Sequence, residues 1–232
     1  MSTAGGMAPK EAAARRAIAE IDDGMVLGLG SGSTVDHAII ALGERVKAGL
    51  RVRLVVASRR SDALARQCGL TPLALDDYEE LDRVIDGADE IDPQLNLIKG
   101  GGGALVREKL LALAGREFVV IADGRKRVPA LGAFPLPVAI LPFGARQTLR
   151  RLAQLCPEVS LRELEGQPVV TDDGLWIADL RAGRIEEPAR LERGLKAITG
   201  VVDVGLFSAM ARRAILGFED GVTQEITPVS PG

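Results

Sequence analysis

Short apolar segments alternate with segments of helical periodicity along the first half of the chain, and this alternation constrains the fold more than any other feature. In residues 34–49, for example, Val35, Ile39, Leu42 and Val46 fall on one helical face. The expected strands are residues 24–30, 50–58, 81–86 and 117–123, and the expected helices are residues 34–49, 61–69 and 103–115. Strands that alternate with helices predict a doubly wound, Rossmann-like α/β fold with a mostly parallel sheet.

The pattern changes at "FPLPVAILPFG", residues 134–144, where several prolines in a short run are typical of a crossing between domains. The elements expected beyond it are a helix over 148–156, a hairpin over 167–180 that turns at "DDG", a helix over 188–200, and strands over 201–207 and 214–226 that return to the first sheet. We therefore expect a Rossmann-like catalytic domain of residues 1–133 plus 203–232, and a second, smaller α+β domain of residues 134–202.

The composition is that of a globular protein and excludes several kinds of partner. The chain has 232 residues, of which 47% are hydrophobic and 26% are charged, and its net charge is -3. Without a dominant basic patch, it is not expected to bind nucleic acid. No apolar run approaches the ~20 residues that a membrane span needs, and the N-terminus lacks the apolar core of a signal peptide. We therefore expect a cytoplasmic protein with no membrane partner.

The cysteines and the histidine do not form a recognisable site. Cys68 and Cys156 are far apart and have no partners at metal-ligand spacing, which argues against a disulfide framework and fits a reducing compartment. His37 is the one histidine of the chain, so neither a His-based zinc site nor a Ser-His-Asp triad is expected. No metal site of these kinds is therefore predicted.

The turn "GLGSGSTV", residues 28–35, joins the first expected strand to its helix. It departs from a dinucleotide fingerprint because Ser33 stands where the last glycine would fall, and from a Walker loop because no lysine precedes the hydroxyl residue. It is instead typical of an anion site at a helix N-terminus, with backbone amides and the hydroxyls of Ser31, Ser33 and Thr34 as donors. The alternative is a tight turn with a Ser/Thr cap.

Four carboxylates follow the third expected strand in "VIDGADEIDP": Asp86, Asp89, Glu90 and Asp92. Ligands of doubly wound sheets bind at the carboxyl ends of the strands, so Asp86 and Asp89 are expected on that rim. A magnesium site is one alternative, and a solvated turn is another, above all for Glu90 and Asp92. Lys99, a few residues later, favours a mixed polar site over a pure metal cage.

The second glycine-rich turn is "IKGGGGALVREK". Residues 100–103 would let the chain pass close to a ligand, although a flexible loop is the alternative. The helix that follows has Val106, Leu110 and Leu113 on one face. It also carries Glu108, which is either part of the same site or a solvated surface charge.

Taken together, "GLGSGSTV", "VIDGADEID", "IKGGGGALVREK" and "FPLPV", with "GVVDVGLF" near the C-terminus, resemble the motifs of the A-type ribose-5-phosphate isomerases in order and spacing. The resemblance runs from Ala12 to Glu225. It implies an aldose-ketose isomerase of the non-oxidative pentose phosphate pathway, which interconverts ribose 5-phosphate and ribulose 5-phosphate without a metal or organic cofactor. It also implies a sugar phosphate as the small-molecule partner and a homodimer or homotetramer.

The resemblance also implies roles for individual residues. Its catalytic residues are Glu108, Asp86 and Lys99. Its substrate-binding residues are Ser31, Gly32, Ser33, Thr34, Asp86, Gly87, Ala88, Asp89, Lys99, Gly100, Gly101, Gly102 and Lys126. The family commonly has threonine at the position of Ser31 and a threonine-bearing version of the segment around Ser61.

The mechanism implied for such a site is proton transfer through a cis-enediolate. Glu108 would move the proton between C2 and C1, and Lys99 with the glycine amides would stabilise the oxyanion. Asp86 and Asp89 would bind hydroxyls, and Asp86 would assist ring opening. Two alternatives are a sugar-phosphate sensor, which would need a DNA-binding segment, and a coenzyme A transferase-like enzyme, in which "DGADEID" would have no role.

Overall fold

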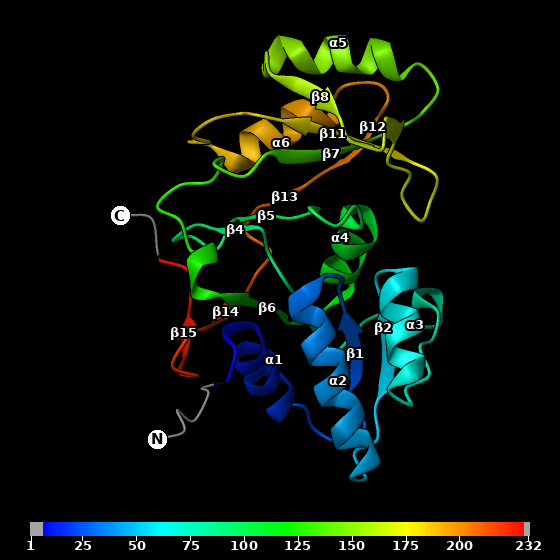
Figure 1. The fold of residues 1–232 in the computed structure, drawn as a ribbon, viewed down its shortest axis with the longest axis vertical. Helices are drawn as coiled ribbons and strands as arrows, with labels where there is room; N and C mark the ends of the chain where they lie inside the picture. Colours follow the sequence, from blue (N-terminus) through cyan, green and yellow to red (C-terminus); the bar gives the residue numbers. More distant parts are fainter. Residues whose placement is uncertain (1–6, 230–232) are drawn as a thin grey trace. The chain divides into compact units, whose positions relative to one another are not determined.

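The computed structural model describes residues 7–229, and Figure 1 shows the course of the chain. The chain forms two compact units. The first contains the described residues up to Gly87 together with Leu110–Lys126 and Ala211–Pro228. The second contains Ala88–Lys109, Arg127–Met210 and the end of the described chain.

These boundaries differ from the domains expected from the sequence, whose first six and last three residues lie outside the described chain. Residues 88–109, 127–133 and 203–210 group with the second unit, which is therefore larger than expected. The reason is a three-stranded sheet in the order β13-β5-β4, which does not extend the first sheet. Its strands are β4 (Glu90–Ile91), β5 (Leu97–Ile98) and β13 (Leu206–Phe207).

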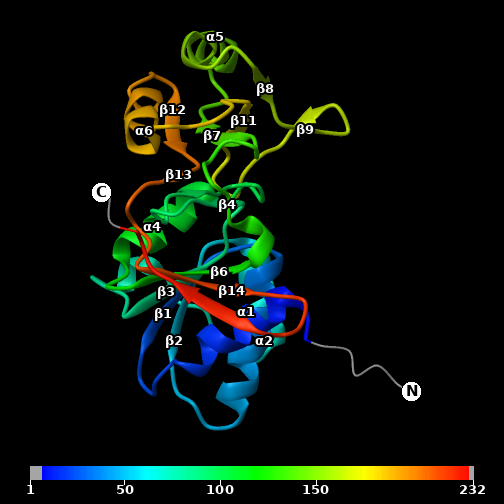
Figure 2. The same ribbon diagram turned by 90° about the vertical axis from the view of Figure 1, so that its left-hand side faces the viewer.

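The first unit is built on a six-stranded sheet in the order β15-β14-β6-β3-β1-β2. Its strands are β1 (Val26–Leu29), β2 (Arg53–Val56), β3 (Arg83–Asp86), β6 (Phe118–Asp123), β14 (Arg213–Gly217) and β15 (Thr223–Ile226). All neighbours pair in parallel except β15, which runs antiparallel to β14 and is the red edge strand in Figure 2. The predicted mostly parallel α/β sheet is confirmed.

Helices α1 (Pro9–Ala19), α2 (Ser33–Lys47) and α3 (Arg59–Gln67) share one hydrophobic core with this sheet. Side chains alternate between the two faces of a strand, so Leu27 and Leu29 of β1 both point into this core. Short helical turns follow at η1 (Leu75–Asp77) and η2 (Gly124–Lys126). This packing leaves the carboxyl ends of β1 and β3 side by side, because Leu29 is paired with Ile85.

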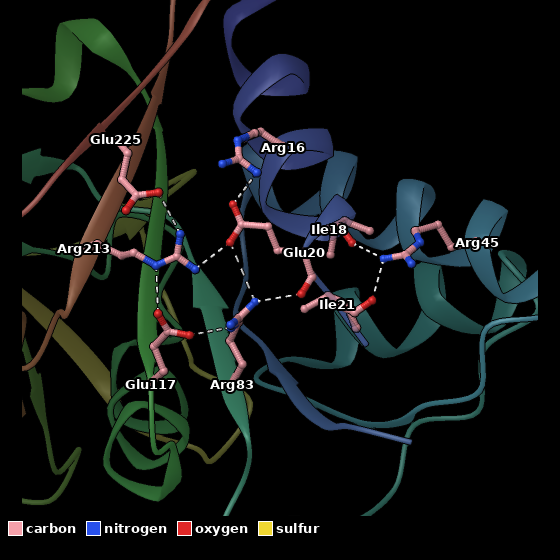
Figure 3. Close-up of polar contacts among 9 residues, drawn as sticks. All are labelled: Arg16, Ile18, Glu20, Ile21, Arg45, Arg83, Glu117, Arg213 and Glu225. Atoms are coloured by element: carbon pink, nitrogen blue, oxygen red, sulfur yellow. Dashed lines mark hydrogen bonds and ion pairs between the residues drawn. The ribbon is translucent and has the colours of Figure 1, made fainter. Parts of the chain in front are cut away.

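Ion pairs join α1, β3, β14 and β15 in the first unit (Figure 3). Arg213, with 13% of its side chain exposed, contacts Glu20 at 2.7 Å, Glu117 at 2.8 Å and Glu225 at 2.9 Å. The second oxygen of Glu117 accepts a hydrogen bond from Nε of Arg83 at 2.6 Å. A network in which each charge has several partners is stabilised cooperatively, so it ties the first helix of the chain to its last strands.

The second unit contains a four-stranded sheet in the order β12-β7-β11-β8, and all its neighbours are antiparallel. The strands are β7 (Leu136–Ile140), β8 (Val159–Leu161), β11 (Trp176–Leu180) and β12 (Val201–Val204). Helices α5 (Ala145–Leu155) and α6 (Pro188–Lys196) share a core with one face of this sheet. A small ladder joins β9 (Glu163–Leu164) to β10 (Gln167–Pro168).

Three expectations for this half of the chain are corrected. Residues 134–144 contain strand β7 and are not a plain crossing between domains. Pro137 is the second residue of β7, and its carbonyl accepts a hydrogen bond from the Gly205 amide at 2.7 Å. Residues 201–207 join β7 and β5 and do not return to the first sheet, which only β14 and β15 do. The hairpin over 167–180 is limited to one bridge between Val170 and Trp176, because β11 pairs mainly with β7 and β8.

Helix α4 (Leu105–Ala114) inverts the expected pattern. Leu110 and Leu113 are 51% and 70% exposed, whereas Glu108 and Lys109 are buried. Glu108 and Lys109 are therefore part of the interior, as are Leu105 and Leu111, whereas Leu110 and Leu113 face outward. Among residues 7–229, no helix is both long enough and apolar enough to cross a membrane.

Candidate active site

The turn between β1 and α2 presents the start of a helix without a side-chain cap. Its N-cap is Gly32, which has no side chain and adopts φ +118°, a conformation that favours glycine. The alternative of a Ser/Thr-capped turn is therefore wrong. Ser33 and Thr34 instead begin the first turn of α2, where backbone amides and the helix dipole favour an anion.

Lys10, which the sequence motifs did not single out, belongs to this turn. Its Nζ donates a hydrogen bond to Oγ of Ser33 at 2.8 Å. Lys10 lies near the start of α1, far from Ser33 in sequence, so no local motif could have indicated it. The contact adds an ammonium group to the amides and hydroxyls at the start of α2.

Asp86 lies at the end of β3 and is almost fully buried. Its Oδ1 accepts hydrogen bonds from the amides of Gly87 at 2.7 Å and Ser31 at 3.3 Å. A Cβ added to Gly30 would lie 1.8 Å from the Asp86 carboxyl carbon, so only glycine at position 30 permits this approach. The structure thus brings the first glycine turn and the first acid together, both within the first unit.

Lys99 and Glu108 form a buried ion pair in the second unit. Nζ of Lys99 lies 3.3 Å from Oε1 of Glu108, and their side chains are 2% and 5% exposed. The ammonium also lies 5.5 Å from the centre of the Phe207 ring. The interpretation of Glu108 as a solvated surface charge is therefore wrong.

The glycines between them form a tight turn. The Gly103 amide donates to the Gly100 carbonyl at 3.0 Å, and Gly100 adopts φ +98°. The Gly101 amide donates to Oδ2 of Asp89 at 2.8 Å, and a Cβ on Gly101 would lie 2.8 Å from the same carboxylate. Asp89 is thus held against this turn by a backbone amide.

The other two carboxylates of the acidic segment serve the backbone. Glu90 is buried and accepts hydrogen bonds from the amides of Gly132 at 2.6 Å and Phe134 at 2.7 Å. Asp92 is also buried, and its Oδ1 accepts from the Asn96 amide at 2.8 Å. Neither belongs to a solvated turn. No group of three or more His, Cys, Asp or Glu side chains within residues 7–229 is placed to hold a metal ion.

The candidate residues fall into two groups by unit. The first unit holds Ser31, Gly32, Ser33, Thr34, Asp86, Gly87 and Lys126. The second holds Ala88, Asp89, Lys99, Gly100, Gly101, Gly102 and Glu108. Lys126 is half-buried at the end of η2.

Comparison with known proteins agrees with this arrangement of motifs. The model of the ribose 5-phosphate isomerase A (phosphoriboisomerase A) family matches residues 53–221. The chain belongs to this family. It is therefore an isomerase, and members of the ribose 5-phosphate isomerase A family interconvert ribose 5-phosphate and ribulose 5-phosphate. The sensor and the coenzyme A transferase-like enzyme are not supported.

Relatives match this isomerase over nearly its whole length. Ribose-5-phosphate isomerase A of Rhodopseudomonas palustris (strain HaA2) is 49% identical over 220 residues, which cover 92% of this chain and 95% of that protein. The solved ribose 5-phosphate isomerase A of Methanocaldococcus jannaschii has 35% identity and a TM-score of 0.89, with 94% of this chain and 97% of that chain covered. A D-ribose-5-phosphate isomerase solved in complex with phospho-erythronic acid has 35% identity and a TM-score of 0.90, with 95% and 100% covered.

Proposed function

We propose that this isomerase converts D-ribose 5-phosphate to D-ribulose 5-phosphate through a cis-enediolate, with Glu108 as the general base. The observation that carries the proposal is the buried contact of Glu108 with Lys99, at 3.3 Å. It places a carboxylate base beside a cation, the combination that proton abstraction next to a carbonyl requires. A coupled assay that detects ribulose 5-phosphate formation tests it directly.

In this mechanism each proton is accounted for. Glu108 removes the proton from C2 of the open-chain aldose, which leaves negative charge on the oxygens of the enediolate. The same carboxylic acid returns the proton to C1, while a proton passes from O2 to O1. Lys99 and the amides of the glycine turn stabilise the charge that develops on oxygen. Asp86 and Asp89 bind sugar hydroxyls, and Asp86 assists ring opening.

The phosphate group is assigned to the start of α2. Ser33 and Thr34 offer hydroxyls and amides there, and Lys10 adds a positive charge. A structural relative binds phospho-erythronic acid, which supports a phosphorylated sugar as the ligand. Lys126 is a further substrate-binding residue in this proposal. The homodimer or homotetramer stays a prediction.

Removing the hydroxyls of Ser33 and Thr34 together by alanine substitution is expected to raise KM strongly and to change kcat little. Hydrogen bonds to charged groups contribute roughly 1.5–3 kcal/mol each, so a rise in KM of about 10-fold or more is expected. Lys10→Met should have a similar effect. Steady-state kinetics measure both, with Lys47→Met at the other end of α2 as the control. An unchanged KM would move the phosphate elsewhere, with Lys126 as the next residue to replace.

Exhaustive chelation is expected to leave the rate unchanged. Asp86 and Asp89 accept hydrogen bonds from backbone amides, and the cation beside Glu108 is Lys99. The rate is measured after dialysis against a strong chelator, with untreated enzyme as the control. A loss of activity that magnesium or manganese restores would return Asp86 and Asp89 to the metal-site interpretation.

A further inference from the structure

The side chain of Arg162 binds backbone carbonyls of the glycine turn, residues 100–103. It lies between β8 and β9, and 17% of its side chain is exposed. Its Nη1 donates to the carbonyl of Gly100 at 3.0 Å and to the carbonyl of Gly101 at 2.9 Å. Its Nε donates to Oδ2 of Asp179, on β11, at 2.8 Å. One guanidinium group therefore contacts two consecutive peptide groups of the turn and is itself held by a carboxylate.

These contacts determine which way the amides of the turn point. The carbonyl and the N–H of a trans peptide group point in opposite directions. With the Gly100 and Gly101 carbonyls turned toward Arg162, the N–H groups of Gly101 and Gly102 are turned away from it. The Gly101 N–H accordingly reaches Oδ2 of Asp89 at 2.8 Å.

The turn needs such an external support because glycines leave its backbone free to adopt many conformations. Arginine is suited to the task, since its planar fork can bind carbonyl groups and a carboxylate at the same time. A lysine has a single ammonium group and cannot match that geometry. The Arg184–Glu186 and Arg190–Glu187 pairs of the same unit are largely exposed, unlike Arg162 and Asp179.

We propose that Arg162 is a positioning residue of the isomerase, which acts through the peptide groups of Gly101 and Gly102 and through Asp89. This inference rests on the proposed function, in which the glycine amides and Asp89 contact the reacting sugar. Asp179 supports it by fixing the plane of the guanidinium group.

The test is a comparison of Arg162→Ala with Arg162→Lys and two controls. Arg162→Ala should lower kcat between roughly 10-fold and 10²-fold, the loss that a small misplacement of reacting groups causes. Arg162→Lys should fall between Arg162→Ala and the wild type. Arg184→Ala controls for the loss of an arginine, and Ile140→Val, in the buried strand β7, controls for lowered stability. Both controls should keep the wild-type kcat.

Chemical rescue separates positioning from stability. Guanidinium chloride at millimolar concentration should restore part of the kcat of Arg162→Ala, because Asp179 and the two carbonyls remain to bind the ion. Sodium chloride at the same ionic strength should not, and neither salt should stimulate Ile140→Val. The proposal is overturned if guanidinium fails to restore activity to Arg162→Ala. It is also overturned if Ile140→Val has the same melting temperature as Arg162→Ala and loses as much kcat.

Other outcomes are also informative. If Arg162→Ala does not fold, Asp179→Asn replaces it in the test. This substitution keeps the shape of the Asp179 side chain but removes the carboxylate that holds the guanidinium group of Arg162. A wild-type kcat in Asp179→Asn would reject the positioning role of Arg162. A folded Arg162→Ala with full kcat, beside a Glu108→Gln variant that is inactive, would reject this inference alone. A wild-type protein without isomerase activity would reject the proposed function itself.

Discussion

Glu108→Gln is expected to lower kcat by roughly 10²–10⁴-fold, the usual contribution of general acid-base catalysis, while KM changes little. Glutamine keeps the shape of the side chain and can still lie beside Lys99, but it cannot accept the proton from C2. A solvated glutamate would show almost no effect, since exposed ion pairs contribute at most ~1 kcal/mol. Steady-state kinetics on the purified, folded variant measure the difference.

The matched control is Glu192→Gln, which removes a carboxylate from a different buried lysine of the second unit, Lys109. Its kcat should stay close to that of the wild type. Reaction of the wild type in deuterated water provides a second check, because an enediolate route allows solvent deuterium into the product and hydride transfer does not. A Glu108→Gln variant that binds substrate and turns over at the wild-type rate would remove Glu108 from the mechanism.

Arg213→Met is expected to lower the free energy of unfolding by roughly 3–5 kcal/mol, the range found when one partner of a buried ion pair is removed. The change deprives Glu20, Glu117 and Glu225 of a shared partner on a side chain that is 13% exposed. Urea denaturation measures the loss. Arg116→Met is the control, because its pair with Glu80 is more than half exposed on the arginine side, and it should lower the free energy of unfolding far less than Arg213→Met does. Equal losses in the two variants would contradict the role assigned to the network.

Because of the same network, the free energy of unfolding is expected to decrease at low pH. Burial raises the pKa of Glu117, but its hydrogen bond to Arg213 and the charge of Arg83 outweigh burial and hold the pKa below its ordinary value. Between the lowered pKa and the ordinary pKa of Glu117, the folded state therefore binds fewer protons than the unfolded chain. The stabilisation from Glu117 is present above its ordinary pKa and is lost as the pH falls through the lowered value. Arg213→Met should weaken this acid dependence in denaturation curves recorded across that range.

The sequence predicted the first unit better than the second for a physical reason. In β1, β3 and β6, short continuous apolar runs and the glycine-containing turns that follow suffice to indicate the strands. The sequence does not indicate strand β7, because Pro137 within it and Pro135 and Pro142 beside it outweigh the apolar residues between them. The destinations of β12 and β13 depend on partners far away in the sequence, which no local pattern contains.

The candidate site shows the same division. The motifs indicated Asp86, Lys99 and Glu108, but not how the charges would be compensated. Helix α4 can bury Lys109 because Nζ contacts Glu192 at 2.6 Å and Asp203 at 3.0 Å, and both come from much later segments. Arg162 likewise lies 62 residues after Gly100 and 61 residues after Gly101, the two residues whose carbonyls accept its hydrogen bonds. Contacts of this kind cannot be predicted from spacing within a motif.

The placement of β14 and β15 also has a consequence for synthesis of the protein. Strands β7, β8, β11 and β12 have all left the ribosome once Val204 has emerged, so the four-stranded sheet can then be complete. At that moment the six-stranded sheet still lacks β14 and β15. Glu20 and Glu117 therefore still lack their ion-pair partner, Arg213. Because domains fold as units when their chain becomes available, the six-stranded sheet, which contains the first strand of the chain, is the last sheet that can be completed.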